Sequence, residues 1–299
     1  MEKAINYHLN KEIIKSEKLT GGLTFQTYLL TLCDGCKVVF RGRRSFTTFG
    51  GRFIDITEVL TRERFFYENI NASVGKICPE VYVIDGSLEY HDTPFCIMEY
   101  LEGVPLDRCY GDFDKKTKEK ISCKIGEQTA KINQVKIDSN HPYMTQRGKW
   151  EDYMAGRISE RLVPHIEDGL VTQEEAEIIT KNMRSKSVEN TDSFIHLDMR
   201  HVNMIYDNGN IYVIDAENCE FGDPLWEITS VETGGQLVPE FIAGYGGVDT
   251  DNIFYKYYLF ERRSLVLNIY RKFIKSDTEG NAFHYNEFMK NKDFLLKDS

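Results

Sequence analysis

Four polar residues between positions 196 and 215 have side chains and spacing that suit chemistry on phosphates. His196, Asp198 and Asn203 fall within eight residues, and Asp215 follows twelve positions after Asn203. Carboxylates packed close together repel one another and resist desolvation unless a cation is present. Such oxygen ligands suit magnesium held jointly with substrate phosphates. A further aspartate can accept a hydroxyl proton or orient the hydroxyl for in-line attack.

A β-hairpin is expected to bring these residues together. Asn208-Gly209, flanked by two apolar runs, is typical of a two-residue hairpin turn. Closing that turn places Asn203 and Asp215 at the same end of the hairpin. Strict alternation would point them to opposite faces. The chain must therefore leave regular pairing if both are to face one ligand. Alternatively, these Asp and Asn residues only cap turns.

The spacing of these residues resembles a known catalytic pattern. His196-x-Asp198-x-x-x-x-Asn203, followed by Ile214-Asp215, is similar to the catalytic loop and metal-binding aspartate of the protein-kinase-like superfamily. The resemblance implies that Asp198 is the catalytic aspartate and that Asn203 and Asp215 bind magnesium. It also implies that His196 braces the loop and does not itself react.

Two later motifs narrow the resemblance to one family. An IDxE sequence ends at Glu217, and a GDP sequence begins at Gly222. Together with HxDxxxxN they resemble the aminoglycoside phosphotransferase family, which also includes choline- and homoserine-kinase-like enzymes. The resemblance implies ATP as the nucleotide, with GTP as the alternative, Mg²⁺ as the metal and a small-molecule hydroxyl as the acceptor.

The same resemblance implies an α+β class and a bilobal protein-kinase-like fold. A small N-terminal lobe would hold an antiparallel β-sheet and one helix, and a larger C-terminal lobe would be mainly helical. The residue patterns predict this order. They indicate strands at 13–19, 25–32, 37–41, 81–84 and 95–100, a helix near 57–70, and helices at 115–135, 150–166 and 172–183. We expect a nucleotide-binding lobe at 1–100 and a helical lobe with the catalytic loop and acceptor site at 101–299.

Parts of the N-terminal lobe match the elements with which kinase-like enzymes hold ATP. Gly21-Gly22 lies between the first two strands, where missing side chains let the backbone approach phosphate, although such a pair also forms plain hairpins. Arg41 falls on the third strand, where the family commonly carries lysine. Arginine can bind phosphate in a bidentate manner but is not interchangeable with lysine, which leaves Arg43 and Lys37 as alternatives.

The expected first helix carries an inward-facing acid. Glu63 shares a helical stripe with Leu60 and Tyr67. A carboxylate on that face is costly unless it is paired, and Arg41 is the natural partner. The alternative is a glutamate at the rim of an amphipathic helix, where charge is tolerated.

The segment 95–103 is an apolar strand that ends in a polar turn between the two lobes. It is similar to the hinge of the family, with Met98 at the back of the adenine pocket. The resemblance implies hydrogen bonds from adenine to the backbone of Glu99 and Leu101. Any buried edge strand can show this pattern, so its place in the chain supports the interpretation. Residues 46–55 resemble an expanded loop with no assigned role.

The acceptor is expected over Asp198, against the helical lobe. Candidates on one helix are Trp150 and Tyr153, which share a face with Arg157, and candidates after the metal aspartate are Glu217 and Glu220. The helical stripe is more often core. Acidic walls would favour a cationic antibiotic, whereas a choline-type substrate would require an aromatic cage.

The net charge and the distribution of apolar residues indicate which partners and which compartment to expect. Asp and Glu number 47 against 37 Lys and Arg, for a formal net charge of −10. Such a surface repels nucleic acid and anionic membrane and attracts a cationic small molecule, or it simply keeps the protein soluble. The first ten residues lack the apolar core of a signal peptide, and no apolar run reaches membrane-spanning length. We expect a cytoplasmic protein, either monomer or homodimer.

The seven cysteines do not suggest a disulfide framework. Cys33 and Cys36 form a lone CxxC around Asp34-Gly35, with no second ligand pair for zinc. An Asp-Gly pair between apolar runs favours a hairpin turn instead.

Three functions fit these observations. The first is an ATP- and Mg²⁺-dependent phosphotransferase that inactivates an aminoglycoside-type or other antibiotic. The second is a metabolic kinase for an amino alcohol, sugar or hydroxy amino acid, and the third is an inactive nucleotide-binding regulator. Retention of Asp198, Asn203 and Asp215 favours an active enzyme.

Overall fold

The structure is a computed structural model that describes residues 1–19, 25–43 and 55–297. The chain forms two compact units. The N-terminal unit comprises Met1–Asp112 and His201–Cys219, and the second unit comprises Phe113–Arg200 and Glu220–Ser299. The segment 201–219 therefore returns to the N-terminal unit, whereas the expected division has a single boundary between residues 100 and 101.

A five-stranded antiparallel sheet forms the N-terminal unit, in the order β1-β2-β3-β5-β4. The strands are β1 (Ile13–Leu19), β2 (Phe25–Leu32), β3 (Lys37–Arg43), β4 (Val81–Asp85) and β5 (Phe95–Glu99). Each strand predicted from the alternation of apolar residues is present. The predicted α+β class is confirmed.

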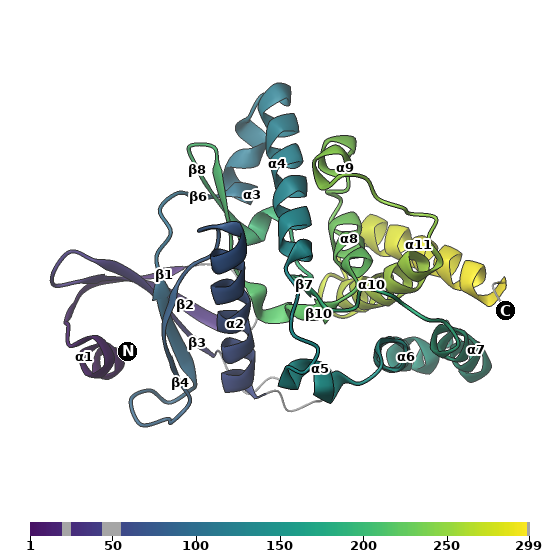
Figure 1. Cartoon of the computed structure of the whole chain (residues 1–299), viewed down its shortest axis with the longest axis horizontal. Helices are drawn as coiled ribbons and strands as arrows, with labels where there is room; N and C mark the ends of the chain where they lie inside the picture. Colours follow the sequence, from purple (N-terminus) through teal and green to yellow (C-terminus); the bar gives the residue numbers. More distant parts are fainter. Residues whose placement is uncertain (20–24, 44–54, 298–299) are drawn as a thin grey trace. The chain divides into compact units, whose positions relative to one another are not determined.

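Two helices cover the two faces of this sheet (Figure 1). Helix α1 (Glu2–Leu9) places Ala4 and Ile5 in a core with Phe40 and its neighbours on the sheet. Helix α2 (Ile56–Val74) covers the other face, and Asp55 caps it by accepting from the amide of Thr57 at 2.9 Å. The segment that forms α1 has only eight residues, which is too short for the spacing of its apolar residues to predict a helix.

The turn between β2 and β3 has the predicted hairpin chemistry. The amide of Gly35 donates to the carbonyl of Leu32 at 2.8 Å, and Gly35 takes a φ of 83°. Only glycine adopts that conformation without strain. Cys33 and Cys36 are free thiols on this turn, so the prediction of a turn is confirmed.

A second hairpin in the same unit consists of β8 (Met204–Asp207) and β9 (Asn210–Val213). Its turn residues, Asn208 and Gly209, take φ values of 49° and 89°. Positive φ at both positions defines a type I′ turn, which matches the twist of paired strands. The short strand β6 (Val104–Pro105) pairs with β8, and the helix α3 (Leu106–Cys109) follows it.

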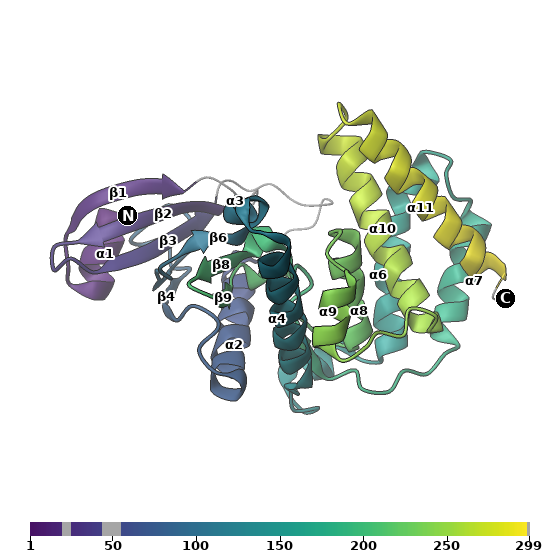
Figure 2. The ribbon, with the colours of Figure 1, turned by 90° about the horizontal axis from the view of Figure 1, so that it is seen from above.

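Helices dominate the second unit. They are α4 (Lys115–Gln134), α5 (Pro142–Arg147), α6 (Trp150–Glu167), α7 (Gln173–Arg184), α8 (Pro224–Thr233), α9 (Pro239–Tyr245), α10 (Ile253–Phe273) and α11 (Thr278–Lys297). Two short strands, β7 (Ser193–Ile195) and β10 (Glu220–Gly222), pair with each other. Helices α10 and α11 lie side by side (Figure 2) and close a core around Trp226, Phe260 and Phe288. Within the described residues, no helix is long and apolar enough to cross a membrane.

Candidate active site

A buried network of charged side chains joins β3, α2 and the segment after β9. Arg41 Nη1 donates to both carboxylate oxygens of Glu63, at 2.8 and 3.0 Å. Its Nη2 donates to Asp215 Oδ1 at 2.7 Å, and its guanidinium lies 4.4 Å from the ring centroid of Phe25. The expected pairing of Arg41 with Glu63 is present, and Asp215 joins it as a second acid.

Arg41 keeps its charge in spite of burial. Burial lowers the pKa of Arg41, but the charges of Glu63 and Asp215 outweigh it and raise that pKa well above the usual value. The hydroxyl of Tyr67 donates to Glu63 Oε1 at 2.6 Å and accepts from the amide of Ala216 at 3.1 Å. The position of Glu63 is therefore fixed from two sides, which suits a residue that must hold Arg41 in place.

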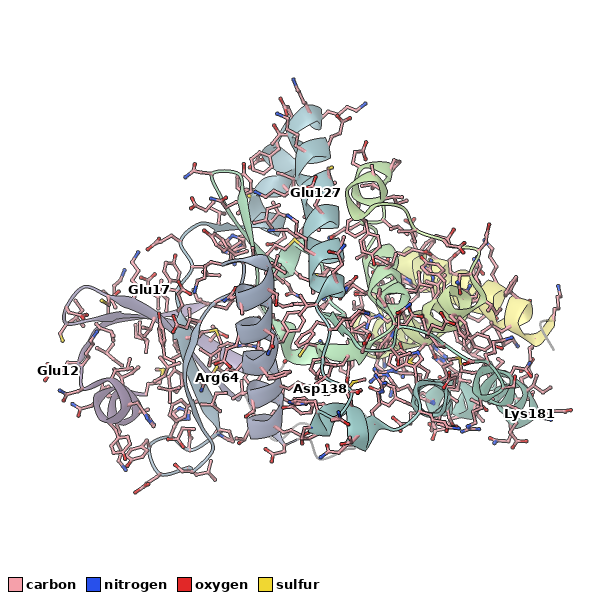
Figure 3. The ribbon with its side chains drawn as sticks, in the orientation of Figure 1. Glu12, Glu17, Arg64, Glu127, Asp138 and Lys181 are labelled. Carbon is pink, nitrogen blue, oxygen red and sulfur yellow. The ribbon has the colours of Figure 1, made fainter. Side chains whose placement is uncertain are left out.

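Helix α2 carries one ion pair at its surface and one carboxylate in the interior. Arg64, labelled in Figure 3, pairs with Glu68 one turn away, and both side chains are largely exposed to solvent. Glu63, the preceding residue, is 1% exposed. An exposed pair such as Arg64–Glu68 contributes little to stability, whereas the buried carboxylate of Glu63 depends on its partners.

Asn203 and Asp215 lie at one end of the β8–β9 hairpin, as predicted. The amide of Ile214 donates to the carbonyl of Asn203 at 3.0 Å. Regular pairing stops at Val213, and Asp215 takes a left-handed φ of 61° before a short 3₁₀ turn that contains Glu217. The chain thus leaves the ladder at the point where strict alternation would have separated the two side chains.

The donor atoms at this end of the hairpin fit a magnesium ion. Asn203 is buried, and the side chain of Asp215 is 31% exposed and supplies carboxylate oxygens. Magnesium is bound through one or two protein oxygens together with substrate phosphates. Among the described residues, no three His, Cys, Asp or Glu side chains gather into a metal site of their own.

The last residues of β5 are held by the adjacent strands and by Glu80. Met98 is buried between Val39 and Val81 on the adjacent strands. The amide of Glu99 donates to the carbonyl of Glu80 at 2.8 Å, which fixes the end of β5.

Beyond β5, Leu101 is half-buried. At Gly103, with a φ of 133°, a Cβ atom would come within 2.6 Å of the Tyr206 carbonyl oxygen. Only glycine fits this approach to the hairpin. Gly21 and Gly22, and residues 46–54 of the expected loop, lie outside the described residues.

In the second unit, the loop after β7 presents Asp198. His196 is buried, and its Nδ1 accepts from the amide of Asp198 at 3.2 Å, which matches a bracing role. Leu197 between them takes a left-handed φ of 62°. The Asp198 carboxylate binds the guanidinium of Arg200 through Nε and Nη2.

The charges around Asp198 keep it ionised. Burial raises the pKa of Asp198, but the hydrogen bond and charge of Arg200 lower it, and His196 and Arg262 add to this effect. The pKa therefore lies below its usual value, and the group is a carboxylate at neutral pH.

A buried acid that the sequence motifs did not single out holds this loop. Glu227 is 0% exposed, and its carboxylate accepts from the amides of His196 and Leu197. On the other side, Ser230 Oγ and Arg262 Nη2 donate to the Leu197 carbonyl at 2.8 and 3.1 Å. The available signal was a glutamate between Trp226 and Ile228, where a buried charge needs partners.

The candidate acceptor residues differ in accessibility. Trp150 is 2% exposed, and its indole donates to the hydroxyl of Tyr258 at 2.7 Å, so it is a core residue and not a pocket wall. A Cβ on Gly222 would come within 2.1 Å of its ring, which explains the glycine of the GDP sequence. Tyr153 and Glu220 are half-buried, and burial together with the charge of Glu220 raises the pKa of Tyr153.

Comparisons with known proteins agree with this geometry. The model of the phosphotransferase enzyme family matches residues 15–253. No curated protein sequence matches the chain significantly.

Solved structures share the fold at low sequence identity. Aminoglycoside phosphotransferase APH(4)-Ia is 16% identical with a TM-score of 0.66, over 100% of this chain and 99% of that one. APH(2'')-Ib, bound to ADP, is 16% identical with a TM-score of 0.64, over 99% and 98%. A provisionally assigned fructosamine-3-kinase from Haemophilus somnus 129PT is 16% identical with a TM-score of 0.69, over 99% and 96%. The chain belongs to the phosphotransferase enzyme family and has the kinase-like fold of the aminoglycoside phosphotransferases.

Proposed function

We propose that this chain transfers the γ-phosphoryl group of ATP to a hydroxyl group of a small molecule, with Mg²⁺ as the metal. The observation that carries the proposal is the buried network of Arg41, Glu63 and Asp215. Arg41 and Glu63 are buried and Asp215 is partly buried. Keeping charged groups out of water is costly, so such a network indicates a binding task. Guanidinium and carboxylate side by side suit the two partners of a nucleotide, its phosphates and its divalent cation.

In this proposal the N-terminal unit binds the nucleotide. Arg41 binds the phosphates in place of the usual lysine, and Glu63 orients it. Met98 lies behind adenine, and the backbone of Glu99 and Leu101 receives its hydrogen bonds. Solved neighbours with ADP, GDP or AMP-PNP support a nucleotide here and leave GTP as the alternative to ATP.

Asn203 and Asp215 would hold magnesium jointly with the phosphates. When bound, the ion neutralises charge on the phosphates during transfer. Asp215 Oδ1 now binds Arg41, so Arg41 must shift towards the phosphates, or share the carboxylate, when the nucleotide enters.

Asp198 would orient the acceptor hydroxyl and receive its proton. Its lowered pKa makes it a carboxylate at neutral pH, although a weak base. We infer that its main contribution is orientation, because phosphoryl transfer depends mostly on positioning and on electrostatic stabilisation. His196 supports the loop, and Arg200 holds the carboxylate until the acceptor arrives.

We rank two classes of acceptor by the ligands and names of the solved neighbours. An aminoglycoside-type antibiotic comes first, because solved neighbours were crystallised with hygromycin B and with kanamycin. Glu217 and Glu220 would then bind the cationic groups, and Tyr153 would contribute through its interaction with Glu220. A sugar-amine kinase comes second, because of the similarity to a provisional fructosamine-3-kinase.

The test is ATP consumption with a panel of hydroxyl compounds, namely kanamycin, hygromycin B, choline and homoserine. Asp198→Asn should reduce kcat by about 10²–10⁴-fold while the Kd for ATP changes little. Asp251→Asn, at a side chain 98% exposed, is the matched control and should behave like the unsubstituted protein. Near-normal turnover in Asp198→Asn would remove the proposed role of this residue.

A further inference from the structure

Arg41 has an aromatic partner in addition to its two acidic partners. The guanidinium of Arg41 lies over the ring of Phe25, 4.4 Å from the ring centroid. A cation within about 6 Å of the face of an aromatic ring is attracted by the electron density of that face. Phe25 therefore adds an uncharged partner to Glu63 and Asp215, which hold the same guanidinium through hydrogen bonds.

The pairing of β2 with β3 places this ring beside the guanidinium. Thr27 on β2 lies directly opposite Arg41 on β3. Phe25 precedes Thr27 by two residues, so its side chain leaves the sheet on the same face. Diagonal neighbours on one face of an antiparallel pair are within reach of aromatic and long side chains. The contact therefore follows from the register of the two strands.

Of the three described partners of Arg41, only Asp215 is open to solvent. Phe25 is 3% exposed and Glu63 is 1% exposed, whereas the side chain of Asp215 is 31% exposed. A ligand that approaches Arg41 therefore meets Asp215 first. Asp215 is also a proposed magnesium ligand, so a bound metal would compete with Arg41 for its carboxylate.

This competition changes what holds Arg41. When Asp215 turns to the metal, the guanidinium loses the hydrogen bond from Nη2, which now measures 2.7 Å. Glu63 stays in place because the hydroxyl of Tyr67 donates to it at 2.6 Å. The ring of Phe25 also stays in place, because magnesium is bound through oxygen atoms and does not take a hydrocarbon ring from its partner.

The same ring gives a physical reason for arginine at position 41, where lysine is usual in the family. A guanidinium is planar and weakly hydrated, and it interacts well with the face of an aromatic ring. An ammonium is compact and strongly hydrated, so it gains less from the same ring. Phe25 on β2 and Arg41 on β3 therefore suit each other.

We propose that Phe25 is a positioning residue for the nucleotide. It holds the Arg41 guanidinium in place while Asp215 changes its partner from Arg41 to the metal, and it makes arginine a better phosphate ligand than lysine at position 41. The proposal rests on the proposed function, in which Arg41 binds the phosphates of ATP. Phe25 acts through Arg41 and does not itself touch the nucleotide.

The first test changes the electrons of the ring and not its shape. Replacing Phe25 by a trifluorinated phenylalanine removes electron density from the ring face with little change in packing. The Kd for ATP in the presence of Mg²⁺ should rise about three- to ten-fold in calorimetric titrations. In EDTA the rise should be smaller, because Asp215 then still holds Arg41.

Phe40 provides the matched control. It is the residue before Arg41 on β3, it is fully buried, and its ring packs against Ala4 and Ile5 on the other face of the sheet. The same fluorinated replacement at Phe40 should leave the Kd for ATP unchanged. The comparison separates an effect on Arg41 from a general effect of fluorine on the core.

The second test asks whether Phe25 favours arginine over lysine. Arg41→Lys should raise the Kd for ATP by about ten-fold in the unsubstituted protein, and by about three-fold or less when Phe25→Leu is also present. The same pair of substitutions should be non-additive in the midpoint of urea unfolding without nucleotide, because the ring and the guanidinium are in contact in the free protein.

The outcomes separate this inference from the proposed function. Equal Kd values after fluorination of Phe25 and of Phe40, or additive effects of Phe25→Leu and Arg41→Lys, would overturn the role of Phe25. A rise in Kd as large in EDTA as with Mg²⁺ would overturn the change of partner at Asp215. Failure of the unsubstituted protein to bind ATP would count against the proposed function, and the urea midpoints would still show whether Phe25 and Arg41 are coupled.

Discussion

The residues proposed to bind ATP and the residue proposed to activate the acceptor are held in different ways. In the N-terminal unit, Arg41, Glu63 and Asp215 hold one another through charged side chains. In the second unit, Glu227 binds backbone amides of the loop that carries Asp198. A charged side chain can exchange its partner for a ligand, whereas a buried amide cannot leave its carboxylate without two groups losing their partner. The first arrangement suits a nucleotide that enters and leaves, and the second suits a residue that keeps one orientation.

The largest effect is expected at Asp215, which binds Arg41 and is also a proposed magnesium ligand. Asp215→Ala should abolish magnesium-dependent nucleotide binding, because it removes the only carboxylate among the proposed ligands. Calorimetric titration of ATP with and without Mg²⁺ measures this. Asp207→Ala, on the same hairpin, is the control. A magnesium dependence that survives in Asp215→Ala would contradict the metal assignment.

Removing Arg41 should separate stability from binding. Arg41→Ala leaves Glu63 buried without its cation, so the free energy of unfolding should fall by about 3–5 kcal/mol, and the KM for ATP should rise. In the double variant Arg41→Met with Glu63→Leu, apolar side chains replace both charges, and stability should return while the KM stays high. Urea unfolding and steady-state kinetics measure the two effects. An unchanged KM in both variants would move the phosphate contact to Lys37 or Arg43.

Lowering the pH should decrease the stability of the folded protein through Glu261, a buried glutamate that accepts from Arg157 and Arg161. Glu261 has a pKa of about 2, against 4.5 for the unperturbed group, so its ionised form stabilises the folded state above pH 4.5. This stabilisation, about 3 kcal/mol, should be lost as the pH falls from about 4.5 to about 2. Urea unfolding at several pH values gives the free energy of unfolding. This free energy should fall less steeply with decreasing pH in Glu261→Gln than in the unsubstituted protein. A slope equal to that of the unsubstituted protein would mean that other groups dominate.

The smallest effect is expected at the buried glutamate that has backbone partners. Glu227→Gln keeps an oxygen for one loop amide, so its cost should be about 1–3 kcal/mol in unfolding free energy. Burial raises the pKa of Glu227, and replacement by a neutral group relieves part of that penalty. Because the loop loosens, kcat should fall while the Kd for ATP stays unchanged. A weaker nucleotide affinity in this variant would break the distinction between the two regions.

The same distinction explains what the sequence could predict. The pairing of Arg41 with Glu63 followed from a charge on the inward stripe of a helix, because few partners were available. The hairpin followed from Asn208-Gly209, whose turn chemistry is local. Local chemistry and fixed spacing are visible in a linear chain, and the fold and the central motifs depended on them.

Contacts between distant segments were not visible in the same way. Glu227 and Arg262 meet the loop at Leu197 from two helices, and nothing in the spacing of the chain specifies that meeting. Trp150 lay on a helical stripe that fitted either a pocket wall or the core, and its indole donates to Tyr258 in the core. Amphipathic spacing gives the buried face of a helix but not what covers it. The side-chain roles at the proposed site stay predictions.

The packing of α1 against the sheet has a practical consequence for handling the protein. Ala4 and Ile5 cover Leu30 and Phe40, so the first turns of the chain complete an apolar layer. A shortened variant that lacks this helix would present bare apolar sheet surface to the solvent, and such patches drive self-association. Loss of solubility after amino-terminal trimming would therefore reflect an uncovered sheet and not a damaged active centre.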